Sequence, residues 1–370
     1  MNSPAAPRGE EFRDDTRAPG SGNAAARRAL SAAELAPLTA LHDGRSLAAV
    51  AVTFGVIAAA VGFAVGVGIS AGNSVGFSPW LLLPVVVIGI QQHALFILAH
   101  EAAHYRLHSR RAVNDALGRF IGMAGGVSMC TYRVTHRLHH NNLYGPEDPD
   151  TAIHGGYPRG VGYLWKKLLQ DLAGLNAWKT YAYFFGAPAL NEATQKAPRP
   201  LDDTSPQLRR AARRDRFGVL AFHLGVPLLL GLTYGSRGLL LYGLLWLLPL
   251  LTVLQPILRL RAVCEHGAVT DLASPLTAAR TTLTTGSRSG RASDRLLNLL
   301  GRAVLFPHHV NHHVEHHLYP AVPHYHLPRL HRLLQARGAL AGAEVRDLRE
   351  TLKIVFAARR PRLVTTQPTA

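Results

Sequence analysis

Histidine is concentrated in three short segments of this 370-residue chain. "HEAAH" begins at residue 100, "HRLHH" begins at residue 136, and "HHVNHHVEHH" occupies 308–317. Residues three and four positions apart are neighbours on a helix, so each segment can present two or three imidazoles on one face. Neutral imidazole binds iron, zinc, copper and nickel. The spacing therefore predicts a metal site that several helices build together.

Nine histidines are the candidate metal ligands. Most belong to the three segments, and one belongs to "CEHG", about two helical turns beyond an apolar run. The nine are His100, His104, His136, His139, His140, His266, His313, His316 and His317. Such a set is large enough for two metal ions with about five protein ligands each.

Four long apolar runs separate and flank these histidines. They occupy about 48–70, 80–104, 217–234 and 238–258. A bilayer crossing needs about 20 consecutive apolar residues. The sequence therefore predicts an all-α membrane protein with four transmembrane helices in two hairpins.

The distribution of basic residues predicts the orientation of these helices. The net charge is +17, and Lys and Arg are abundant in 105–216 and 259–370, whereas the connector 71–79 contains none. Loops rich in Lys and Arg stay in the cytoplasm. Both termini and all histidine segments are therefore expected on the cytoplasmic side. The charge is then a topology signal, and no binding of nucleic acid is expected.

Composition also suggests how the chain is divided. Residues 1–46 carry mixed charge and many Ala, Arg and Ser residues, which predicts a disordered cytoplasmic tail without a cleavable signal peptide. A membrane domain is expected over 47–340 and a cytoplasmic C-terminal tail over 341–370. The two cysteines, Cys130 and Cys264, provide neither a disulfide framework nor a Cys-x-x-Cys metal motif.

Three histidine segments interleaved with four spans resemble the integral-membrane fatty acid desaturase and hydroxylase family. "NHHVEHHLYPAVPHYHLPRLH" (311–331) is similar to the third histidine box of that family and the residues after it. "RAVCEHG" (261–267), followed by "RTT", resembles a bacterial branch. The resemblance covers roughly residues 48 to 335. It implies a cytoplasmic helical cap that holds a non-haem di-iron centre. The nine histidines would be its ligands, and His312, which falls at a variable position, is left out.

The resemblance also implies an activity. The expected enzyme is a multi-pass protein of the bacterial inner membrane that uses O2 to attack an unactivated C–H bond of a lipid-like chain. Desaturation of a fatty acyl chain is favoured; hydroxylation or ketolation of a fatty acyl, carotenoid or natural-product substrate is the alternative. The first box has three intervening residues, whereas the acyl-CoA branch has four, so an acyl-CoA preference is not transferred. With no cytochrome b5-like segment, electrons are expected from a separate protein such as a ferredoxin.

Two other classes of protein were weighed. "HEAAH" matches the His-Glu-x-x-His signature of zinc proteases, in which Glu101 would be the general base. That chemistry needs one more ligand and an open position, and it leaves the two His-x2-His-His triplets unexplained. A metal transporter would carry ionisable groups inside the spans, where the sequence offers only His93 and His223. Both classes are disfavoured.

Several further residues are expected to support the site. A metal-bound imidazole usually donates its second N–H to an acceptor. The candidate acceptors are Glu101, Asp148, Asp150, Glu265 and Glu315. His93 is expected to be a hydrogen-bonded bundle residue, and three more histidines are expected in the cap or on the surface. These three are His324, His326 and His331.

Overall fold

The computed structural model describes residues 21–358 except 71–77, 189–198, 273 and 286–290. Within these ranges the chain is mostly helical, as predicted. Four helical segments are long and apolar enough to cross a membrane, which confirms the expected number of spans. They are Ala32–Val67, Pro79–Ala103, Pro206–Tyr234 and Ser236–His266.

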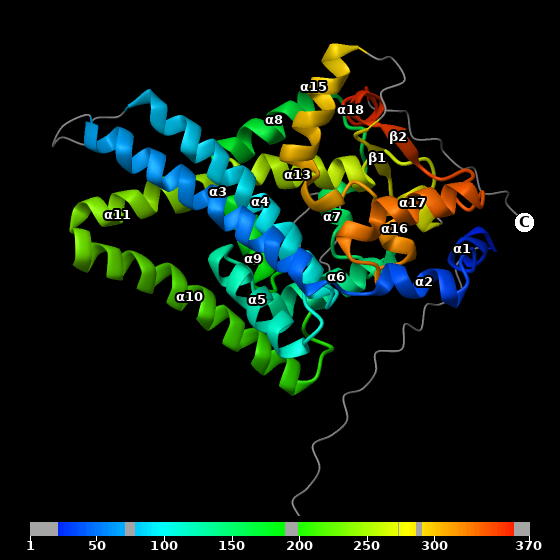
Figure 1. Ribbon diagram of the computed structural model, residues 1–370, viewed down its shortest axis with the longest axis horizontal. Helices are drawn as coiled ribbons and strands as arrows, with labels where there is room; N and C mark the ends of the chain where they lie inside the picture. Colours follow the sequence, from blue (N-terminus) through cyan, green and yellow to red (C-terminus); the bar gives the residue numbers. More distant parts are fainter. Residues whose placement is uncertain (1–20, 71–77, 189–198, 273, 286–290, 359–370) are drawn as a thin grey trace, which may run out of the picture.

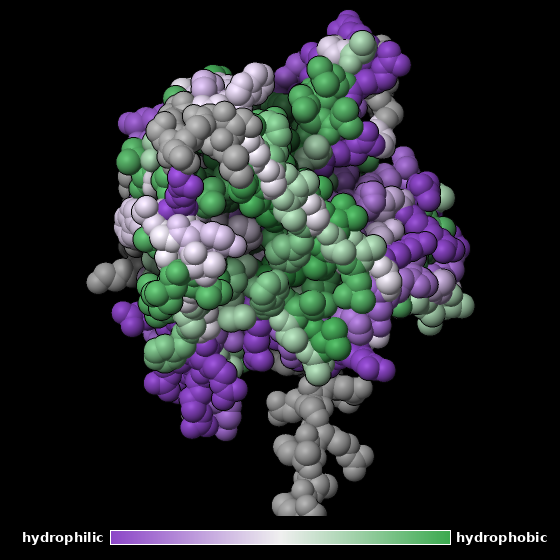
Figure 2. All heavy atoms as spheres, turned by 60° about the vertical axis from the view of Figure 1, so that its left-hand side comes forward, coloured by the Kyte–Doolittle hydropathy of each residue, from purple (hydrophilic) through white to green (hydrophobic). Residues whose placement is uncertain are grey.

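The long helices lie on the left of Figure 1, in two packed pairs. Helix α3 (Asp43–Ser70) runs beside α4 (Leu82–Ala103), which follows the short turn η1 (Pro79–Leu81). Helix α10 (Pro206–Tyr234) packs on α11 (Ser236–Tyr242). Figure 2 shows a broad apolar surface on this side of the molecule. Large apolar side chains are exposed on α3, among them Val52 and Phe63, and on α10, among them Leu224, Leu228 and Leu232.

The fourth segment is not one continuous helix. After α11 the chain winds through a π-helical turn, η2 (Gly243–Leu247), and a short helix, α12 (Leu248–Leu251), before α13 (Leu254–His266). Pro249 lacks a backbone N–H, and a proline inside a helix disrupts the bond to the residue four positions earlier. The run predicted to end near residue 258 therefore continues, with interruptions, as far as His266. Similarly, α10 begins at Pro206 rather than near residue 217, because Ser205 caps it.

Shorter helices connect these segments and surround the histidines. Between α4 and α10 the chain forms α5 (Arg111–Ala124), α6 (Met129–Asn142), α7 (Thr151–His154), α8 (Val161–Leu172) and α9 (Ala177–Phe184). After α13 it forms α14 (Pro275–Ala278), β1 (Thr281–Leu283), α15 (Ala292–Leu300), η3 (Gly301–Leu305), η4 (Pro307–His309), α16 (His313–Leu318), η5 (His324–His326), α17 (Leu327–Ala336), β2 (Val345–Asp347) and α18 (Leu348–Val355).

The N-terminal segment differs from its prediction. Disorder over 1–46 is wrong for the described part, which contains α1 (Ser21–Arg27) and α2 (Ala32–Thr39) and the start of α3. Ser31 and Glu34 cap α2 reciprocally. Leu38 is fully buried against the core that also covers α16 and α17, and burial of one leucine stabilises by about 1.5–3 kcal/mol. Residues 1–20 lie outside the described ranges.

The C-terminal segment is also folded over much of its length. β2 pairs in parallel with β1, with Thr281 opposite Val345, so the predicted all-α chain contains one small sheet. Asp347 caps α18, whose Leu348 and Val355 are buried. Residues 345–355 therefore belong to the folded domain rather than to a separate tail, and 359–370 lie outside the described residues.

Candidate metal centre

The ends of four helices bring the nine predicted histidines together. His100 lies in the last turn of α4 and His104 directly follows that helix. The middle triplet lies on α6, His266 is the last residue of α13, and the third triplet lies on α16. The nine imidazoles form two groups, one of five and one of four. Each group draws on helices that are far apart in sequence.

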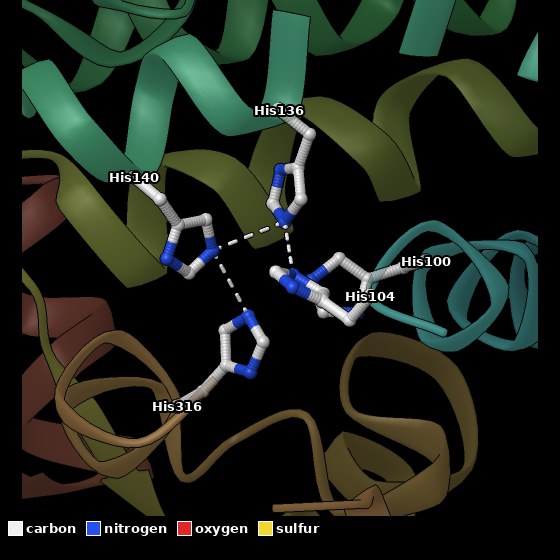
Figure 3. A group of neighbouring side chains, drawn as sticks. All are labelled: His100, His104, His136, His140 and His316. Carbon is white, nitrogen blue, oxygen red and sulfur yellow. Dashed lines mark hydrogen bonds between the residues drawn. The ribbon is translucent and has the colours of Figure 1, made fainter. Parts of the chain in front are cut away.

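The group of five is shown in Figure 3: His100, His104, His136, His140 and His316. The Nε2 atom of His136 lies 2.8 Å from Nε2 of His104 and 3.1 Å from Nε2 of His140. Nε2 of His140 is also 3.1 Å from Nε2 of His316. The ring of His100 lies 4.5 Å from the rings of His136 and His316, measured between centroids. The imidazoles thus point toward a common centre.

The group of four contains His139, His266, His313 and His317. Nε2 of His266 lies 3.1 Å from Nε2 of His139 and 2.8 Å from Nε2 of His313. The Nε2 atoms of His313 and His317 are 3.2 Å apart. The ring of His317 stacks on that of His140 at a centroid distance of 4.2 Å, so the two groups are direct neighbours.

These nitrogen contacts fit bound cations better than mutual hydrogen bonds. A ring nitrogen carries either one hydrogen or one lone pair, yet Nε2 of His136 faces two other Nε2 atoms at hydrogen-bond distance. The same holds for Nε2 of His140, His266 and His313. Two metal–imidazole bonds of about 2.0–2.1 Å at a right angle would put their nitrogens about 2.9 Å apart. The donor set and its spacing are therefore compatible with a metal site.

Burial keeps most of these imidazoles in the form that binds metals. For five histidines outside the long apolar segments, burial, assisted by charge repulsion from neighbouring histidines, lowers the pKa well below its ordinary value. These are His136, His140, His313, His316 and His317. A histidine must be neutral to ligate a metal. These neutral imidazoles can therefore bind cations.

Acceptors outside the two groups orient several of the rings. His139 donates through Nδ1 to Asp148 Oδ1 at 2.9 Å, and His266 donates through Nδ1 to the Ala278 carbonyl at 3.1 Å. Each bond leaves Nε2 free to face its group. Burial lowers the pKa of His139, but Asp148 outweighs it and the pKa rises to about 9. The Asp148 carboxylate itself accepts two backbone N–H groups, those of Tyr144 and Asp150.

The other predicted acceptors are placed less uniformly. Glu101 lies 3.4 Å from Nδ1 of His100, and Glu265 lies 3.8 Å from Nδ1 of His313. Asp150 lies 3.8 Å from Nδ1 of His139. Glu315 instead accepts from His331 and Thr281, on the side of α16 away from the two groups.

We expect Asp148→Asn to weaken metal binding. The substitution keeps the shape of the side chain but removes the negative charge that holds Nδ1–H of His139. Partners of this kind change metal affinity by about 10–100-fold. Metal retained against a graded series of chelator concentrations would measure the effect. Glu147→Gln, at an exposed neighbouring position, is the matched control, and equal retention in both variants would contradict the orienting role.

The remaining histidines lie outside the two groups. His324, His326 and His331, expected in the cap or on the surface, are all buried. His331 and Glu315 form a cluster with His312, which stays outside the two groups as expected. His93 donates through Nδ1 to the Val304 carbonyl at 2.9 Å, in keeping with a bundle residue.

His154 is a site residue that the sequence did not reveal. It is 1% exposed, and its ring lies 4.7 Å from that of His266 and 5.8 Å from that of His139. Neither ring nitrogen has a hydrogen-bond partner among the described residues. It stands alone in "DTAIHGG", without the i, i+3, i+4 spacing, and only its proximity to Asp148 and Asp150 in sequence could have drawn attention to it.

A cavity of about 190 Å³ opens beside both histidine groups. The rings of His100, His136, His139, His266 and His313 contribute to its lining, together with His154. An aromatic wall of Phe96, Tyr132 and Phe184 closes another side, with ring centroids 5.2–5.7 Å apart. A substrate in this cavity would lie directly against the candidate metal ligands.

Comparison with known proteins adds two findings. The family model described as "Fatty acid desaturase" matches residues 76–349. A dihydrorhizobitoxine desaturase of Bradyrhizobium elkanii is 26% identical over 268 residues, which cover 69% of this chain and 68% of that protein. Residues 76–349, which the family model matches, contain all nine candidate ligands.

Proposed function

The chain belongs to the fatty acid desaturase family, and on that premise we propose that it is a membrane-bound, O2-dependent di-iron oxidase. The observation that carries this proposal is the convergence of nine histidines in groups of five and four. Two adjacent groups of this size suit two iron ions, and the nine imidazoles would be their ligands. The substrate would be a lipid-like aliphatic chain, and the favoured reaction is formation of a C=C bond.

The protein residues would position and protect the reaction. Bound iron would supply the oxidising chemistry, with O2 as co-substrate and a separate protein such as a ferredoxin as electron donor. The imidazoles hold the metals, while Asp148 and the Ala278 carbonyl fix the rings of His139 and His266. The aromatic wall of the cavity places a methylene group near the ligands and keeps water away from it.

We also propose the membrane arrangement predicted above. The four long helices would cross the bilayer as two hairpins, with the histidine-bearing cap and both chain ends on the cytoplasmic side. The exposed apolar side chains of α3 and α10 support membrane contact. At the N-terminal end of α10, "RRAARRDR" (209–216) supplies the basic residues that mark a cytoplasmic boundary.

Desaturation is preferred to hydroxylation on one observation. The relative from Bradyrhizobium elkanii is named a desaturase. A hydroxylase or ketolase on the same scaffold is the second candidate. A zinc protease is disfavoured, because His100 and His104 share their group with three further histidines and the Glu101 carboxylate accepts the backbone N–H of His324 at 2.8 Å.

Iron content and product mass test the proposal together. Protein purified in detergent should carry about two iron ions per chain, since each histidine group suits one ion. Supplied with a reduced ferredoxin and O2, it should remove two hydrogen atoms from its substrate; gain of one oxygen atom would instead identify a hydroxylase. Lipid and metabolite profiles of expressing cells would supply candidate substrates. One zinc ion per chain, with no dependence on O2, would contradict the di-iron oxidase.

A further inference from the structure

The cavity beside the histidines has a strongly charged wall. Six of its lining residues carry charge: Asp150, Asp171, Lys179, Arg259, Arg261 and Glu265. Placing hydrocarbon against charged groups deprives those groups of water without compensation. A purely aliphatic chain is therefore poorly matched to this wall, whereas a substrate with a polar group could satisfy it.

Part of the charged wall is already paired internally. Arg259 makes a two-pronged ion pair with Asp171, which also accepts from Asn176. Asp150 accepts from the Tyr183 hydroxyl and lies near His139. These groups need no partner from a ligand.

Two cationic side chains retain unused hydrogen-bond donors. Arg261 binds Glu265 through Nη1 at 3.0 Å, but its Nε is buried without a hydrogen-bond partner in the described parts of the chain. Lys179 is half-buried, and no carboxylate among the described residues lies within 4.0 Å of its ammonium group. The ammonium group lies 5.6 Å from the centroid of the Trp178 ring. Arg261 and Lys179 therefore have hydrogen-bond donors without acceptors, and an anionic ligand would supply those acceptors.

The size of the cavity limits the length of chain that it can hold. Its volume is about 190 Å³. Phe96, which packs on Tyr132 and Phe184, lines this cavity and also a second, apolar space of only about 10 Å³. A cavity of this volume has room for a short aliphatic segment beside the histidines.

From the unused donors and the volume of the cavity, we propose that the substrate is a short aliphatic carboxylate whose anionic group binds Arg261 and Lys179. Its C–H bonds within a few carbons of the carboxylate then face the histidine groups. This inference deepens the proposed function and rests on it for the reaction, but the binding preference itself requires no turnover. Lys179 and Arg261 are specificity-determining residues in this scheme.

Binding of hexanoate and hexanamide to the metal-loaded, full-length protein in detergent tests the inference. The two compounds share a chain length and differ in charge, and calorimetry gives both dissociation constants. We expect the protein to bind hexanoate about 10-fold or more tightly than hexanamide. Lys179→Met should remove most of this preference. Lys166→Met, an exposed lysine on α8 outside the cavity, should keep it.

Three outcomes would overturn the inference. The protein could show no preference for hexanoate, the preference could survive in Lys179→Met, or it could fall equally in Lys166→Met. The preference would survive in Lys179→Met if the carboxylate bound directly to the metal instead of to Lys179. Arg261→Gln is a second variant. Because that substitution also removes the ion-pair partner of Glu265, Lys179→Met is the more specific of the two. An inactive protein that still prefers hexanoate would count against the oxidase alone, and an active one without that preference would count against this inference alone.

Discussion

His316→Ala is expected to abolish turnover and lower the iron content while leaving the protein in the membrane. His316 joins the group of five through Nε2, 3.1 Å from Nε2 of His140, and its ring contacts that of His100. Residues that only orient a ligand change metal affinity or activity by about 10–100-fold. Loss of the ligand itself should exceed that range. Iron per chain by mass spectrometry and the turnover rate are the two measurements.

The control for this prediction lies in the same histidine-rich segment. His309 is exposed and belongs to neither group, so His309→Ala should retain iron and activity. Gel filtration and thermal unfolding in detergent would show whether His316→Ala remains folded. Full activity in folded His316→Ala would remove this histidine from the proposed ligand set.

Arg280→Met should destabilise the protein more than any surface substitution. The Arg280 side chain is fully buried and donates to three carbonyls at the end of α13, those of Cys264, Gly267 and Ala268. It also pairs with buried Glu344 at 3.3 Å. Arg346 still pairs with Glu344 at 2.9 Å in this variant, so the main loss is that of the donors to the three carbonyls, and each buried carbonyl left without a donor costs about 1–3 kcal/mol. Denaturant unfolding of the detergent-solubilised protein would measure the loss of free energy.

The comparison for Arg280→Met is Arg295→Met. Arg295 is exposed on α15, and substitutions at such positions change the free energy of unfolding by about 0.5 kcal/mol or less. Arg280 binds the turn that follows His266, so Arg280→Met should also lose metal more readily than Arg295→Met. Equal stability of the two variants would show that the buried contacts of Arg280 contribute little.

Local patterns made the candidate site predictable. Ligands three and four residues apart on one helix leave a signal in the sequence, and "HRLHH" and "HVEHH" carry it. The four apolar segments were predictable for a similar reason, because their composition and length alone separate them from the rest of the chain. His266 was found through its position after the fourth run, although the structure extends that interrupted helical segment as far as His266 itself.

Long-range contacts account for most of what the sequence did not predict. Helices α1 and α2 are short and fold against α16 and α17, so their own composition indicated only a tail. The strands β1 and β2 have three residues each and lie far apart in sequence. His154 enters the site through the fold of α7 onto α13. The burial of His331 likewise depends on Glu315, which no spacing rule connects to it.

The distribution of the nine histidines along the chain also sets the order of biosynthesis. His104 and His317 belong to the earliest and latest of the converging elements. At a synthesis rate of about 5–20 residues per second, the last ligands follow the first by roughly 10–40 s. The first apolar helices can therefore enter the membrane well before either histidine group is complete. On the proposed function, iron loading would be a late event that follows insertion, and the newly made protein would first be a metal-free membrane intermediate.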